Sequence, residues 1–117
     1  MTNEAVRALA DNLLKSAPSI KNQIKEIDIK IKNNAPNIVE LKTNRDNQKN
    51  ILIKIINAIG TLSYDNQKII CYKYFEGLSW AEIGVRLSLK GLTVSARASK
   101  NKLALGKILF DNEGDLI

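Results

Sequence analysis

Residues 79–94 read Ser-Trp-Ala-Glu-Ile-Gly-Val-Arg-Leu-Ser-Leu-Lys-Gly-Leu-Thr-Val, and this segment decides the fold. Ser79 and Glu82 have the spacing of a capping box, in which the side chain of each residue accepts a hydrogen bond from the backbone amide of the other. The short helix that begins here is followed by a glycine-containing turn at residues 88–92 and by a longer helix, which we expect Thr93 to cap. A short capped helix, a turn of a few residues and a second helix form a helix-turn-helix unit.

A third helix precedes this unit. Ser63 is placed to cap a helix that begins at Tyr64, and Gly77 is suited to the left-handed exit of that helix after Glu76. All aromatic residues of the chain lie in this C-terminal half, so we expect the compact core there. The helix is expected to be mostly buried, because apolar residues cover a broad part of its surface: Ile69, Ile70, Cys71, Tyr74 and Phe75.

Apolar residues recur at heptad-like spacing in the N-terminal half, and this stripe suits a helical hairpin or a short coiled coil. Arg45 and Gln48 occupy two of its positions and make a polar patch. Two uses of the stripe remain open, namely homo-oligomerisation and packing within one chain. Its apolar members are Ile20, Ile24, Ile27, Ile31, Ile38, Leu41, Leu52, Ile55 and Ile59.

Two prolines interrupt this half of the chain. Residues 4–16 are expected to form a short first helix that ends before Pro18. We expect this proline to lie in the first turn of the next helix. Residues 33–37, which contain Pro36, form either a turn between antiparallel helices or a kink in a continuous helix.

These patterns predict an all-α fold. An N-terminal helical hairpin or coiled-coil arm covers residues 1–60, a three-helix helix-turn-helix domain covers residues 61–110, and an acidic tail covers residues 111–117. We expect the tail to fray. The C-terminal domain alone is near the size at which a core is only marginally stabilising, so the arm is expected to add core or to leave that role to a partner subunit.

The composition excludes several classes of site. The chain has one cysteine, Cys71, and no histidine, which excludes zinc fingers and serine–histidine triads and fits a reducing compartment. Its acidic residues are scattered, so we expect no enzyme, no metal and no cofactor. No apolar run is long enough to cross a bilayer, and the first residues lack the pattern of a secretory signal, so we expect a cytoplasmic protein without a membrane partner.

Positive charge is concentrated in the C-terminal segment, within a net charge of +6 that favours a polyanionic partner. Between Val85 and Lys107 every charged residue is a lysine or an arginine. A solvated basic face on a packed helix would also explain this pattern, but its position directly after the turn favours contact with double-stranded DNA. Arginine matches guanine and asparagine matches adenine at base edges, whereas lysines bind phosphates. The candidate DNA-contacting residues are Ser79, Arg86, Lys90, Thr93, Ser95, Arg97, Lys100, Asn101 and Lys102.

The C-terminal half resembles the promoter-reading C-terminal domain of bacterial sigma factors at Leu62-Ser63, at residues 74–84 (Tyr-Phe-Glu-Gly-Leu-Ser-Trp-Ala-Glu-Ile-Gly) and at Thr93-Val94. More closely, it is similar to phage late-gene transcription activators of the ArpU and RinA type, which join a helical N-terminal part to a sigma-like helix-turn-helix. The resemblance implies DNA binding upstream of a phage promoter and recruitment of host RNA polymerase. It also implies that the reading helix lies at residues 93–102.

Two residues depart from the pattern of that family. Ser88 stands where the turn often has glycine, and Arg97 stands where an apolar residue is usual if Val94 fixes the register. A frame shifted by one residue, with an insertion in the turn at residues 90–92, would bury Ala98 and expose Arg97. We prefer this shifted frame.

The sequence supports one leading function and two alternatives. The leading function is sequence-specific transcription regulation of phage or prophage origin, by an activator that acts with host RNA polymerase. The main alternative is a phage DNA-packaging recognition subunit, similar to a small terminase, which would assemble into rings. The third is an interaction module in which the isoleucine stripe binds a partner helix and the basic face is incidental.

Overall fold

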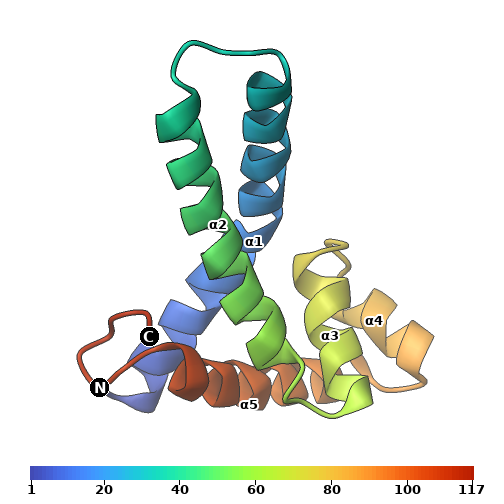
Figure 1. The fold of residues 1–117 in the computed structure, drawn as a ribbon. Coiled ribbons are helices and arrows are strands. Elements are labelled where there is room, and N and C mark those ends of the chain that lie inside the picture. The colour runs from blue at the N-terminus through green and yellow to red at the C-terminus, as the bar shows by residue number, and fades with distance from the viewer.

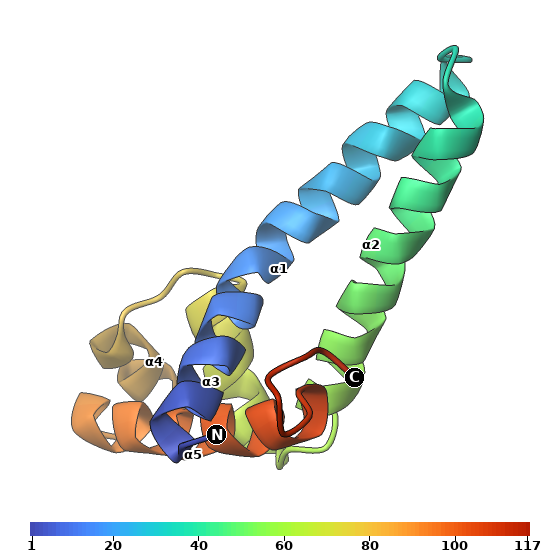
Figure 2. The same ribbon diagram turned by 90° about the vertical axis from the view of Figure 1, so that its left-hand side faces the viewer.

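The structure, a computed structural model that describes residues 1–117, contains five helices and no strand, which confirms the all-α class. Figure 1 shows α1 and α2 side by side, with the ends that residues 33–37 join extending away from the other three helices, and α5 running along the opposite end of the molecule beside the start of α1. The second view in Figure 2 shows the same division. No helix combines the length and the apolarity that a membrane crossing requires. The helices are α1 (Asn3–Lys32), α2 (Ile38–Ile59), α3 (Tyr64–Tyr74), α4 (Trp80–Leu87) and α5 (Gly91–Leu109).

Helix α1 continues through Pro18, so the prediction that a first helix ends before this proline is wrong. A proline inside a helix removes one backbone hydrogen bond and costs roughly 3 kcal/mol. Beyond Pro18, however, the helix buries Ile20, Ile24 and Ile27. Burial of each such side chain contributes about 1.5–3 kcal/mol, so the apolar stripe outweighs the cost of the proline.

Helices α1 and α2 pack against each other along this stripe. The chain turns between them at residues 33–37, where Asn34 adopts a left-handed conformation with a φ of 56°. In the polar patch, Nη1 of Arg45 lies 3.4 Å from Oδ1 of Asp28, so an ion pair joins the two helices. The stripe is therefore used within one chain, and its buried members are Ile20, Ile24, Ile27, Leu41, Ile55 and Ile59.

The main core draws on both halves of the chain, so the core is not confined to the C-terminal half as the aromatic residues suggested, and the expectation that the arm adds core is confirmed. Ile70 of α3 and Leu105 of α5 are fully buried in the same cluster as Leu14 of α1 and Ile55 of α2. The neighbouring Ile69 instead belongs to a smaller cluster that joins α3, α4 and α5. The three C-terminal helices build only this small cluster by themselves, and α1 and α2 supply most of the main core, as expected for a domain near the lower size limit.

The C-terminal tail folds back on itself, which corrects the prediction that it frays. Phe110 and Leu116 form an isolated antiparallel bridge. The carboxylate of Asp111 accepts hydrogen bonds from the backbone amides of Glu113 and Asp115 at 2.9 and 3.0 Å. One acidic side chain of the tail is therefore used to hold the turn closed.

Candidate functional site

Helix α4 begins with the predicted capping box. Oγ of Ser79 accepts a hydrogen bond from the amide of Glu82, Oε1 of Glu82 accepts one from the amide of Ser79, and both distances are 3.1 Å. These hydrogen bonds lower the pKa of Glu82, which stays ionised. The carboxylate thus occupies the helix N-terminus, where a phosphate would otherwise bind. Ser79 is therefore removed from the candidate DNA contacts.

The turn between α4 and α5 is tight. Ser88 adopts the left-handed conformation, with a φ of 57°. A Cβ atom added to Gly84 would lie 2.5 Å from the carbonyl oxygen of Leu89. Only glycine at this position lets the backbone of the turn lie against α4, and this contact fixes the point at which α5 begins.

Helix α5 starts earlier than predicted. Its N-cap is Lys90, which makes no side-chain capping hydrogen bond, and its first residue is Gly91. The amide of Val94 donates to the carbonyl of Lys90 at 3.1 Å. Thr93 therefore lies inside the first turn as an exposed residue, and the prediction that it caps the helix is wrong.

The body of α5 has one buried face and one exposed face. Val94 and Ala98 are fully buried, and Arg97 is exposed. The preferred frame, which buries Ala98 and exposes Arg97, is confirmed. Val94 is buried as well, because residues four apart in a helix share a face.

Exposed cations gather on the free side of α5 and at its start. No acidic residue lies between Glu82 and Asp111, and none of these cations belongs to an ion pair. Helix α5 runs along the edge of the molecule in Figure 1, and the side chains of these cations are exposed. We call this side of α5 the basic face, and it consists of Lys90, Thr93, Arg97, Lys100 and Lys107.

Lys102 lies outside the basic face, contrary to prediction. Its side chain is only 22% exposed, and Nζ lies 3.7 Å from Oδ1 of Asp11 in α1. Asp11 also pairs with Lys15 at 2.8 Å and accepts a hydrogen bond from the hydroxyl of Tyr74 in α3. Burial opposes ionisation of Asp11, but these three partners outweigh it and lower its pKa. Burial and the Asp11 carboxylate raise the pKa of Tyr74. Lys102 thus helps to join α5 to α1.

Three further candidates differ from their predicted roles. Asn101 is 4% exposed, on the same face as the buried residues of α5, so the prediction that it reads base edges is wrong. Ser95 is half-buried. Arg86 remains on the surface, but its guanidinium pairs with Glu76 at 3.4 Å and lies 5.0 Å from the ring centre of Tyr72.

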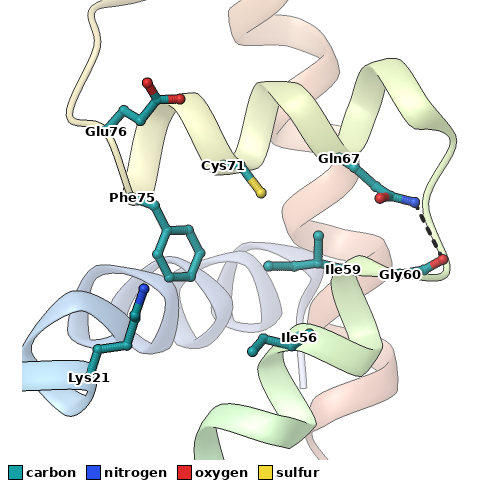
Figure 3. Close-up of a pocket in the computed structure, with 8 residues that line it drawn as sticks. All are labelled: Lys21, Ile56, Ile59, Gly60, Gln67, Cys71, Phe75 and Glu76. Atoms are coloured by element: carbon teal, nitrogen blue, oxygen red, sulfur yellow. Dashed lines mark hydrogen bonds between the residues drawn. The ribbon is translucent and has the colours of Figure 1, made fainter. Parts of the chain in front are cut away.

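The structure also has an apolar groove between α2 and α3, with a volume of about 430 Å³. Figure 3 shows Cys71 of α3 pointing toward Ile59 of α2, and Phe75, the residue that follows α3, pointing into the same groove. Burial raises the pKa of the Cys71 thiol, so this cysteine stays protonated and unreactive near neutral pH. The chain contains no group of histidine, cysteine and acidic residues that could hold a metal ion.

Four predicted residues, Lys90, Thr93, Arg97 and Lys100, do come together on the basic face. No protein-family model, curated protein or solved structure matches the chain. The chemistry of the face follows from its own side chains. Cations and a hydroxyl, with no carboxylate beside them, can donate hydrogen bonds to phosphate oxygens and to base edges.

Lys107 and Leu92 are exposed residues of α5 that were not among the predicted candidates. Lys107 follows Lys100 by seven residues and therefore lies on the same face. This spacing is visible in the sequence and could have identified it. Leu92 is 86% exposed. No local signal identifies Leu92, because its exposure depends on how the turn places the start of α5.

Proposed function

We propose that this protein binds double-stranded DNA sequence-specifically, and that α4, the turn at residues 88–90 and α5 act as a helix-turn-helix. The observation that carries the proposal is the basic face, with its four cations free of ion pairs and no acidic residue in its segment. A helix with one exposed face fits the major groove of B-DNA, which is about 12 Å wide. An acid-free face is also what a polyanionic partner requires.

Within this proposal, the residues of α5 have different tasks. Arg97 lies in the second turn of the helix, where side chains reach base edges, and it matches guanine through two hydrogen bonds. Lys90, Lys100 and Lys107 bind backbone phosphates, which hold the helix in register without reading sequence. Thr93 is exposed in the first turn and is available to contact a base edge or a phosphate.

The biological role that we propose is transcription regulation of phage or prophage origin, by activation together with host RNA polymerase. Its support is the similarity of the C-terminal half to sigma-like activators, together with the capping box and the left-handed residue between α4 and α5. A ring-forming DNA-packaging subunit would also bind DNA. Light scattering separates the two, because a monomer or dimer favours the activator and a large closed ring favours packaging.

Selection of bound sequences from random duplex DNA, followed by titration of the best sequence, tests the proposed function. The double variant Arg97→Ala, Lys100→Ala should bind at least about tenfold more weakly, because each lost charge-assisted contact is worth roughly 1–3 kcal/mol. The matched control is Lys30→Ala, Lys32→Ala, which removes the same charge from exposed positions at the end of α1. Equal binding by the wild type and both double variants would contradict the proposal.

A further inference from the structure

Leu92 is the most exposed large apolar residue of the chain, at 86%. It lies in the first turn of α5 and belongs to neither apolar cluster. Its neighbours on the free side of the helix, Thr93 and Ala96, are also exposed, and each ends in a methyl group. The start of α5 therefore presents a small apolar surface.

This apolar surface adjoins the basic face. Leu92, Ala96 and Lys100 follow one another at intervals of four residues, so they lie along one side of the helix. Arg97 stands one turn beyond Thr93. At 3.6 residues per turn, Leu92 lies at one edge of the exposed side of α5 and Arg97 at the other, with Ala96, Lys100 and Thr93 between them.

The major groove of duplex DNA offers one apolar group, the C5-methyl group of thymine. We propose that Leu92, with the methyl groups of Thr93 and Ala96, contacts thymine methyl groups in the target. This inference rests on the proposed function and adds to it the chemical group that α5 recognises, the thymine methyl group. The target then contains thymine beside the base pair that Arg97 reads.

The helix geometry limits how far apart the two bases lie. Leu92 and Arg97 are five residues apart, which corresponds to about 7.5 Å along a helix that rises about 1.5 Å per residue. Base pairs follow one another at about 3.4 Å along the duplex. We therefore expect the thymine within about two base pairs of the guanine that Arg97 reads.

Replacing thymine by deoxyuridine in the selected duplex tests this inference, because only the C5-methyl group is lost. Each thymine is replaced in turn, and binding is titrated by fluorescence anisotropy. At one or two positions the wild type should bind about fourfold more weakly, as expected for the loss of one buried methyl group. Leu92→Ala should bind the thymine duplex more weakly and should no longer distinguish deoxyuridine from thymine.

The matched control is Val39→Ala, because Val39 is 79% exposed and lies in the first turn of α2, which begins at the far end of the molecule from α5 (Figure 1). This variant should keep the preference for thymine. Equal binding of the two duplexes by the wild type, or a preference that survives in Leu92→Ala, would overturn the inference while leaving DNA binding intact. Absence of any duplex binding by the wild type would overturn the proposed function along with it.

Discussion

Ser88 holds a conformation that its own side chain disfavours. Its φ of 57° lies in the left-handed region, which costs an L-residue roughly 1–2 kcal/mol. Ser88→Gly removes that cost at the price of a more flexible unfolded chain, so we predict a net gain of about 0.5–1 kcal/mol in the free energy of unfolding. Urea denaturation measures the gain. Ser88→Ala keeps a Cβ atom and should give none, and a gain of equal size in the alanine variant would disprove the cause assigned here.

Asp11 ties three helices together through a half-buried carboxylate. Because its folded-state pKa is lowered, its stabilising contribution is present above the ordinary value of 3.8 and is lost as the pH falls through the lowered pKa. We predict that Asp11→Asn lowers the free energy of unfolding by about 1–2 kcal/mol at pH 7. The difference from the wild type should shrink at pH 3.

Urea denaturation at both pH values checks this prediction. Asp28→Asn is the control, because Asp28 also pairs between helices but its side chain is 47% exposed. An exposed pair contributes little, so this variant should change stability by less than about 1 kcal/mol. An Asp11→Asn effect that is the same at pH 7 and pH 3 would contradict the role of the carboxylate charge.

The roles of residues on α5 were predictable only where they depend on the helical spacing of apolar residues in α5 itself. The exposure of Arg97 and the burial of Ala98 follow from the spacing of apolar residues. The pairing of Lys102 with Asp11 does not, because Asp11 comes from the other end of the chain. Asn101 was also misassigned, since sequence alone does not reveal that another helix covers its side.

Between elements, α5 packs closely against α1 at Gly106. A Cβ atom added to Gly106 would lie 2.5 Å from Cγ1 of Val6 and 2.8 Å from its carbonyl oxygen. Gly106→Ala should force the two helices apart and cost about 1–3 kcal/mol of stability, measured by thermal or urea unfolding. In Gly91→Ala the new Cβ would stand 3.4 Å from its nearest neighbour, so stability should hold or rise. Equal losses in both variants would refute the close contact as the cause.

Helix starts were predictable where capping side chains act on their immediate neighbours. Ser63 and the Ser79–Glu82 box cap their helices as predicted, because a cap involves residues only three positions apart. Pro18 was misjudged, since the burial that keeps α1 continuous comes from contacts with distant helices. The start of α5 was misjudged for a similar reason, as the contact of the turn with Gly84 sets it.

Across the whole molecule, the arm and the C-terminal helices share one core. Leu14, Ile55, Ile70 and Leu105 come from four helices and are all fully buried in it. The aromatic residues pointed to the C-terminal half, but aliphatic residues of the arm fill the interior. This shared core holds α5 against α1, and the residues of the basic face remain exposed.

The dependence of DNA affinity on salt measures directly whether that free face binds phosphates. Contacts from Lys90, Lys100 and Lys107 predict that the logarithm of the association constant falls with the logarithm of salt concentration at a slope of about −2.7, or about −0.9 for each phosphate. Lys107→Ala should reduce the slope to about −1.8, whereas Lys30→Ala on the arm should leave it unchanged. A slope near zero, or one that changes equally in both variants, would contradict binding through the basic face of α5.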